Sequence, residues 1–236
     1  VRLFNPSRSR SNAFRRGLEL IVKYFTATRR MHNKCWIADG RLAIIGGRNI
    51  GDAYFDAAEG ANFRDIDFLV AGKAVRDAEA IFDRYWNSDA ALPIRSLHKL
   101  RRPKLCKLIF TLKQVCDSQP ARDYVKLCDS NSGDPRTFSD ADGYHWTGDA
   151  QVIADPPEKA MGRRTEEWLG NRIDSLLQSA RAELRITSPY FIPGRAGSET
   201  LQQLSSLGVD VRVLTNSLAA TDVMAVHGAY AKYRRK

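Results

Sequence analysis

The residues best suited to chemistry form a spaced set between positions 32 and 49. Its members are His32, Lys34, Asp39, Gly46, Gly47 and Asn49. An imidazole beside an ammonium suits an anionic phosphoryl group, because the histidine attacks phosphorus while the lysine neutralises charge on the equatorial oxygens. Side chains alternate along a strand, so a strand over residues 32–38 places His32 and Lys34 on one face. The set therefore predicts phosphoryl transfer.

The other members of the set predict a turn and a phosphate contact. Asp39 has the opposite parity and lies in the turn dipeptide Asp39-Gly40, so its expected role is to fix a hairpin turn. Asn49 and the backbone amides after Gly46 can donate to phosphate oxygens at the start of a helix expected near Ile50.

The spacing His32-x-Lys34-x4-Asp39-x6-Gly46-Gly47-x-Asn49 resembles the HKD motif of the phospholipase D superfamily, HxKx4Dx6GSxN. Gly47 departs from the commoner serine and removes a hydroxyl. Residues 31–34, 46–52, 82–88 and 188–191 are similar to the cardiolipin synthase-like bacterial branch. The resemblance implies a two-step mechanism through a phosphohistidine, with no metal or organic cofactor.

The resemblance also implies a carboxylate that orients the histidine. In related phospholipases an aspartate before the next strand holds the nucleophilic histidine, which assigns this role here to Asp65, with Asp67 as second choice. Such an acceptor fixes the imidazole tautomer and stabilises the cation. The alternative is that Asp65 is a solvated acid at a strand edge.

One motif supplies only half of the superfamily's site, because a second histidine protonates the leaving group. No other histidine in the chain has a lysine two residues later. The second half-site is expected from a missing C-terminal segment or from another subunit. Residues 1–6 resemble residues 211–217, which suggests a repeat and a chain truncated at both ends.

Strands that alternate with helices predict an α/β sandwich, and the resemblance implies that it is of the phospholipase D-like type with two similar halves. The first half, 1–128, carries the motif; 129–164 is a polar linker; 165–236 begins the second half without its motif. The elements expected in the first half are a helix over 11–28, strands over 1–4, 32–38, 41–45 and 68–72, and a helix over 74–88. In the second half they are helices over 165–183 and 197–206, strands over 184–190 and 209–215, and a final helix from about Asp222.

Net charge and cysteine spacing limit the classes of ligand and partner that the chain is expected to bind. Lys and Arg number 37 against 27 Asp and Glu, a net charge of +10, which attracts nucleic acid, anionic lipid or phosphorylated small molecules. The four cysteines lack CxxC spacing and clustered histidines, so a zinc site is not expected.

Residues 94–115 combine an apolar stripe with many basic residues and are interrupted near Pro103. Such a segment can rest on an anionic membrane surface, or can pack as a core helix with a solvated basic face. No interleaved aromatic platform favours nucleic acid. We therefore expect a cardiolipin synthase-type phosphatidyltransferase, peripheral on the cytoplasmic side of a bacterial inner membrane. The alternatives are a nuclease or phosphodiesterase of the same superfamily, and a non-catalytic membrane- or polyanion-binding protein.

Overall fold

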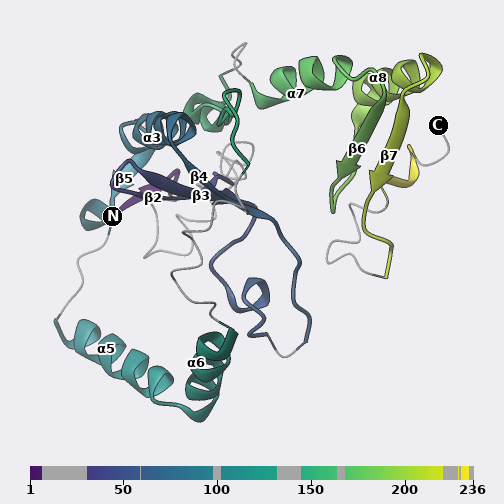
Figure 1. The fold of residues 1–236 in the computed structure, drawn as a ribbon. Helices are drawn as coiled ribbons and strands as arrows, with labels where there is room; N and C mark the ends of the chain where they lie inside the picture. The colour runs from purple at the N-terminus through teal and green to yellow at the C-terminus, as the bar shows by residue number, and fades with distance from the viewer. Residues whose placement is uncertain are drawn as a thin grey trace. The chain divides into compact units, whose positions relative to one another are not determined.

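The computed structural model describes residues 1–6, 31–58, 60–97, 102–131, 145–163, 168–219, 228 and 230–233. The chain forms two compact units, residues 1–164 and 165–236, each of which is described by itself (Figure 1). The helix expected over 11–28 lies outside the described residues, and so does most of the helix expected from Asp222.

The first unit is built on an antiparallel three-stranded sheet. Its strands, in the order β2-β3-β4, are Lys34–Ala38, Leu42–Gly46 and Asp67–Ala71. The β2-β3 turn holds Asp39 and Gly40 at φ values of 52° and 63°, and the amide of Arg41 donates to the carbonyl of Ala38 over 3.0 Å. Positive φ at both central residues is the pattern of a type I′ turn, which matches the twist of a hairpin. The predicted hairpin is confirmed.

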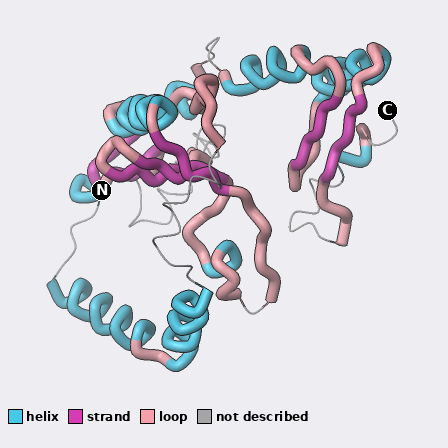
Figure 2. Tube along the Cα trace, viewed as in Figure 1, coloured by secondary structure: helices cyan, strands magenta, loops and turns pink. Residues whose placement is uncertain are grey.

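One face of this sheet is covered by helix α3, Lys73–Trp86 (Figure 2). The core between them contains Ala43, Val75 and Ala78, with Ile37, Ile45, Val70 and Val152 packed against it. Because side chains alternate along a strand, Ile37 and Lys34 point to opposite faces of β2. Lys34 pairs directly with Gly46, and Gly46 with Asp67, so these three residues form one row on the face away from α3.

Two expectations around the motif change in the structure. Strand β2 begins at Lys34, two residues later than predicted, so His32 lies just before it. The helix expected near Ile50 is a single 3-10 turn, η1, Asp52–Tyr54. The physical reason is local, because Arg48 donates to the carbonyl of Tyr54 over 2.9 Å and holds the loop folded back.

The rest of the first unit contains a second sheet and several helices. They are β1 (Arg2–Phe4), which pairs antiparallel with β5 (Ala91–Pro93), α4 (Ile94–Leu97), α5 (Arg102–Cys116), α6 (Gln119–Asn131) and η4 (Pro157–Met161). Part of the expected linker contacts α3: the amide of Val152 donates to Asp77 over 3.3 Å, and the Tyr85 hydroxyl donates to the carbonyl of Asp155 over 2.9 Å. The division into two similar halves stays a prediction.

The second unit is a parallel β-α-β arrangement preceded by a helix. Its elements are α7 (Leu169–Gln178), β6 (Glu183–Thr187), α8 (Gly194–Ser206) and β7 (Asp210–Leu214). Strands β6 and β7 pair in parallel, so α8 is the crossover that parallel pairing requires. The predicted α/β class is confirmed. In the described part of the chain no helix is long and apolar enough to cross a bilayer.

Candidate active site

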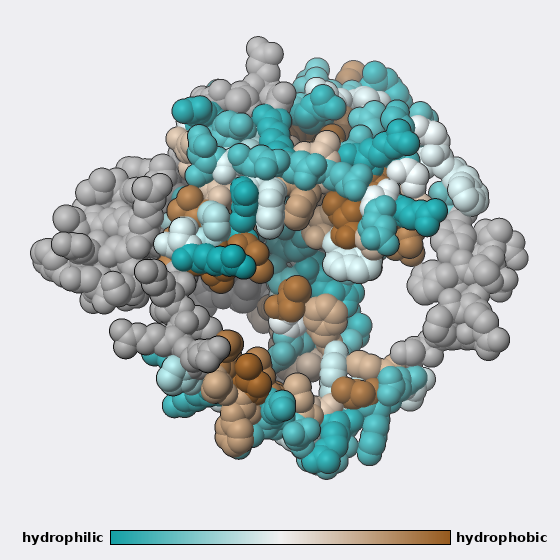
Figure 3. Space-filling view, turned by 90° about the vertical axis from the view of Figure 1, so that its left-hand side faces the viewer, coloured by the Kyte–Doolittle hydropathy of each residue, from teal (hydrophilic) through white to brown (hydrophobic). Residues whose placement is uncertain are grey.

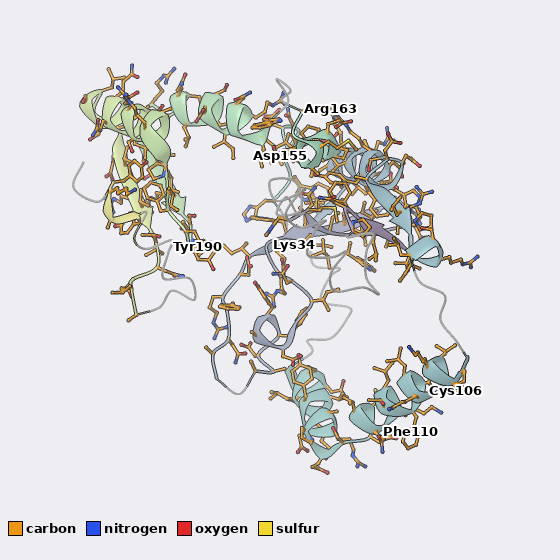
Figure 4. The ribbon with its side chains drawn as sticks, turned by 180° about the vertical axis from the view of Figure 1, so that it is seen from behind. Lys34, Cys106, Phe110, Asp155, Arg163 and Tyr190 are labelled. Carbon is orange, nitrogen blue, oxygen red and sulfur yellow. The ribbon has the colours of Figure 1, made fainter. Side chains whose placement is uncertain are left out.

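A pocket of about 630 Å³ lies where strands β2, β3 and β4 meet the loop after β3. Its lining residues are Asn33, Lys34, Cys35, Trp36, Ile44, Gly46, Arg48, Asn49, Ile50, Phe55 and Asp67. Four predicted residues, Lys34, Gly46, Asn49 and the second-choice carboxylate Asp67, therefore share one pocket. Lys34 stands at the start of β2 (Figure 4).

The His32-Lys34 pair is held together through the backbone. The Lys34 ammonium donates to the carbonyl oxygen of His32 over 2.8 Å. The His32 side chain is exposed, and among the described residues its imidazole makes no hydrogen bond. The bond from Lys34 involves the backbone of His32, and His32 is not one of the residues that line the pocket. Its exposed imidazole is chemically able to receive a phosphoryl group, because an incoming diester can reach it.

Arg48 is a second cation in this pocket, and no motif in the sequence predicted a role for it. Its Nε donates to Asp67 Oδ2 over 2.7 Å, and its backbone amide donates to Asp67 Oδ1 over 3.4 Å. The guanidinium also lies over the Phe55 ring, 5.5 Å from the ring centroid. Asp67 is thus engaged by Arg48 rather than by His32. The only signal in the sequence was position: Arg48 stands between the two glycines and Asn49.

The glycine pair makes room for two carboxylates. A Cβ on Gly46 would come within 1.9 Å of Asp67 Oδ1, and one on Gly47 within 2.2 Å of Asp65 Oδ1. Real Cβ atoms do not approach other atoms so closely, so both positions require glycine as the neighbours stand. Gly47 therefore departs from the commoner serine at a position where a side chain would displace Asp65.

Four predicted residues lie outside the pocket lining, namely His32, Asp39, Gly47 and Asp65. Asp65 Oδ1 accepts the amide of Ile66 over 2.9 Å, and between the described residues Asp65 and His32 there is no hydrogen bond. Asp39 lies in the hairpin turn, about 16 Å from Lys34 at 3.3 Å per residue along β2. The roles of all the predicted site residues, Lys34 and Asn49 included, stay predictions.

Asn49 is positioned by an aromatic neighbour. Its Nδ2 donates to the Tyr54 hydroxyl over 2.8 Å, and the Tyr54 ring packs on Phe63 with centroids 5.1 Å apart. Tyr54 also belongs to the single turn that replaces the expected helix, which is too short to offer a helix N-terminus to a phosphate. The amide side chain of Asn49 can still donate to an oxygen in the pocket, because an amide nitrogen carries two hydrogens.

Tyr85 of α3 links the residue between His32 and Lys34 to the rest of the unit. Burial raises the pKa of its phenol, Asp155 adds to the rise, and a hydrogen bond with the Asn33 side chain opposes it. The Tyr85 hydroxyl donates to the carbonyl of Asp155 over 2.9 Å. Tyr85 is therefore a positioning residue for the start of β2. The apolar periodicity of the sequence had predicted only that Tyr85 packs on the apolar face of this helix.

Replacing Tyr85 with phenylalanine is expected to lower the free energy of unfolding at pH 7 by about 1 kcal/mol, the usual net loss of one hydrogen bond. The folded pKa lies above the unfolded value, so the native state keeps a proton that the unfolded state loses above about pH 10. Tyr85 therefore stabilises the fold most below pH 10, and this stabilisation falls as pH rises further.

Urea unfolding at pH 7 and at several pH values above 10 checks this, with Tyr233→Phe as control. Among the described residues the Tyr233 hydroxyl makes no hydrogen bond. The wild-type and Tyr85→Phe stabilities should converge at high pH, and a constant difference across the range would contradict the assignment.

A second pocket of about 560 Å³ lies at the opposite end of the sheet. It is lined by Gly40, Arg41, Gly72, Lys73 and Arg76. None of its residues belongs to the predicted catalytic set, although Gly40 follows Asp39 in the hairpin turn. The candidate site is therefore the pocket that contains Lys34 and Arg48.

The fold and the pocket define an α/β protein with a cationic site at the start of its first hairpin. The chain is 33% identical to cardiolipin synthase C of Escherichia coli K12 over all of this chain and 49% of the relative. It is 28% identical to a cardiolipin synthase of Halalkalibacterium halodurans over 80% of this chain and 29% of the relative. The chain belongs to the phospholipase D superfamily, in its cardiolipin synthase-like branch.

The similarity extends to a further bacterial protein and covers only part of the length of each relative. An uncharacterized protein of Helicobacter pylori 26695 is 32% identical over all of this chain and 47% of the relative. No family model matches the chain, and no solved structure matches it. The chain spans about half the length of the full-coverage relatives, which have 49% and 47% of their length matched.

Proposed function

We propose that this chain supplies one half of the active site of a cardiolipin synthase-type phosphatidyltransferase, which acts on phospholipid phosphodiesters through a phosphohistidine. The observation that supports the proposal is a pocket that contains Lys34 and Arg48, with the Lys34 ammonium bonded to the backbone carbonyl of His32, the residue that precedes the pocket lining at Asn33. The similarity to cardiolipin synthases supports the lipid class of substrate.

In the first step, an imidazole nitrogen of His32 attacks phosphorus and the bond from phosphorus to one alcohol oxygen breaks. The leaving alkoxide takes a proton from the histidine of the second half-site. In the second step, that histidine removes a proton from the incoming alcohol, whose oxygen attacks phosphorus and releases His32. Atoms and charge balance with a diester as both donor and product, so no cofactor enters the reaction.

The cations of the pocket stabilise the negative charge on phosphorus in both steps. The Lys34 ammonium bonds a carbonyl in the free site, and an anionic phosphoryl oxygen is a stronger acceptor than a carbonyl. Arg48 is held by Asp67, so it offers its positive charge from a fixed position. Preorganised donors of this kind stabilise the transition state without reorganisation. Asn49 adds a neutral donor.

The partner half-site comes from a further segment of the protein or from another subunit. With the second histidine absent, residues 1–236 as a monomer are expected to be inactive, because nothing protonates the first leaving group. The lipid substrates place the enzyme at a membrane, and we propose peripheral association on the cytoplasmic side of a bacterial inner membrane.

Incubating the protein expressed from its complete gene with labelled phosphatidylglycerol, phosphatidylethanolamine and single-stranded DNA tests the function. We expect transfer of the labelled phosphatidyl group to a second lipid or alcohol, identified by mass spectrometry, and no cleavage of DNA. Cleaved DNA with unchanged lipids would indicate a nuclease of the superfamily. No product from any of the three would support the non-catalytic alternative and overturn the proposal.

A further inference from the structure

Helix α5 carries an aliphatic stripe that no other described part of the chain covers. The stripe consists of Leu105, Leu108, Ile109, Leu112 and Val115, spaced three and four residues apart. Their exposed fractions run from 41% at Leu105 to 58% at Val115, and every side chain over 103–116 is exposed. Leaving five aliphatic side chains in water along one helix is unfavourable, so a surface that covers the stripe would stabilise the protein.

The charges around the stripe define the chemistry of that partner. At 100° per residue, Lys104 flanks one edge of the stripe and Lys113 flanks the other, while Lys107 lies on the opposite, polar face. Helix α5 contains no aspartate or glutamate. Lysines at both edges of an apolar stripe can extend toward anionic headgroups while their stems cover apolar surface. A surface that matches this helix is apolar in its interior and negatively charged at its boundary.

The next helix connects α5 to the candidate active site. Helices α5 and α6 are joined by a short turn at 117–118, in which the Ser118 amide donates to the carbonyl of Val115 over 3.1 Å. In α6, the Tyr124 hydroxyl donates to the carbonyl of Phe55 over 2.8 Å, and Phe55 lines the pocket with Lys34 and Arg48. A partner bound to α5 is therefore held one helix away from the pocket wall.

We propose that α5 is a membrane-docking helix, which lies in the interface of an anionic phospholipid bilayer with its aliphatic stripe among the acyl chains. The proposal deepens the proposed function and rests on it, because it names the surface from which the pocket takes its lipid. In the lower part of Figure 3, hydrophobic and hydrophilic side chains lie interleaved at the surface. Cys106 and Phe110 extend from α5 (Figure 4).

The charge pattern favours a bilayer over a protein partner. The fully buried core of a protein interface is depleted in charged residues, whereas an interfacial helix is rich in lysine along its polar face. Each lysine near an anionic surface strengthens binding by about fivefold. Two flanking lysines therefore predict that binding depends on the fraction of anionic lipid and on salt.

Co-sedimentation of the complete protein with vesicles tests the docking helix separately from catalysis. Vesicles of phosphatidylcholine with phosphatidylglycerol are compared with vesicles of phosphatidylcholine alone. We expect binding to the anionic vesicles only. The double variant Leu108→Glu with Leu112→Glu should weaken it on the order of a hundredfold, because two leucines leave the acyl region. The double variant Lys104→Gln with Lys113→Gln should weaken it about 25-fold and reduce its salt dependence.

The matched control is the double variant Leu176→Glu with Leu207→Glu, which changes two exposed leucines of the second unit. It should bind vesicles as the wild type does, and circular dichroism should show that all variants are folded. Equal vesicle binding by the α5 variants and the wild type would overturn the docking helix. A change in oligomeric mass in the α5 variants without vesicles would also overturn it, because it identifies a second copy as the occupant.

Failure of the docking helix and failure of the proposed function give different results. His32→Ala should leave vesicle binding unchanged while removing transfer. The α5 variants should lose transfer from vesicles but keep transfer from a short-chain lipid below its micelle concentration. Vesicle binding through α5 with no transfer from either lipid would contradict the proposed transferase activity but would support α5 as a membrane-docking helix.

Discussion

Replacing His32 with alanine or asparagine in the protein from the complete gene is expected to lower phosphatidyl transfer on the order of 10⁴-fold or more. The labelled phosphoenzyme should disappear as well, because neither side chain can form a covalent bond to phosphorus under these conditions. The imidazole is exposed and makes no hydrogen bond among the described residues, so its removal leaves no buried group unpaired. The free energy of unfolding should therefore stay within about 0.5 kcal/mol of the wild type.

The matched control is His145→Ala, which removes another exposed histidine of the same unit. We expect it to retain full transfer and a full yield of phosphoenzyme in a rapid-quench experiment with labelled lipid. Transfer retained by either His32 variant would refute the nucleophile assignment. Loss of transfer with a normal phosphoenzyme yield would assign His32 to the second step instead, and that result also contradicts the proposal.

The hairpin that carries the motif could be predicted because its signals are local. Asp39-Gly40 is a dipeptide that tolerates positive φ at both positions, and the structure shows φ values of 52° and 63° there. The flanking strands follow from alternation, and α3 follows from an apolar period of three to four residues. These patterns depend on neighbours within a few residues, which a single sequence contains in full.

The contacts that organise the pocket could not be predicted, because they join residues that are distant in the sequence. Arg48 and Asp67 are 19 residues apart, and Tyr124 and Phe55 are 69 apart. No periodicity encodes such pairs, since each depends on how a loop folds back on the sheet. The helix expected near Ile50 was wrong for a local reason: side-chain bonds from Arg48 and Asn49 to Tyr54, six and five residues away, hold the segment as a single turn.

The glycine pair shows how one local pattern can have two physical meanings. In the sequence, Gly46 and Gly47 indicated backbone amides open to a phosphate. In the structure they also leave space for the carboxylates of Asp67 and Asp65, which no spacing rule could indicate. Both meanings are compatible, because a residue without a side chain exposes its backbone and admits a neighbour. The second meaning leads to a prediction that the first does not.

Gly46→Ala is expected to destabilise the first unit by about 1–3 kcal/mol, the usual cost of overpacking. The new Cβ would lie 1.9 Å from Asp67 Oδ1, 2.6 Å from the carbonyl oxygen of Ile66 and 2.8 Å from Asp67 Cα. The carboxylate can rotate only by leaving Arg48, and the other two atoms belong to the backbone around the start of β4. Relief therefore requires β3 and β4 to separate, which also moves Arg48 in the pocket.

Gly47→Ala should cost less than Gly46→Ala, because the atoms nearest its Cβ belong to the exposed side chain of Asp65, at 2.2 Å and beyond. Gly148→Ala is the control, since no heavy atom outside its chain neighbours lies within 4 Å of its Cβ. In urea unfolding, Gly46→Ala should be the least stable variant, Gly47→Ala intermediate and Gly148→Ala the most stable. Transfer activity should fall most for Gly46→Ala. A Gly46 variant as stable as the Gly148 control would mean that β3 and β4 do not pair as closely as the Gly46-Asp67 register requires. Arg48 would then lack the fixed position from which it stabilises charge on phosphorus.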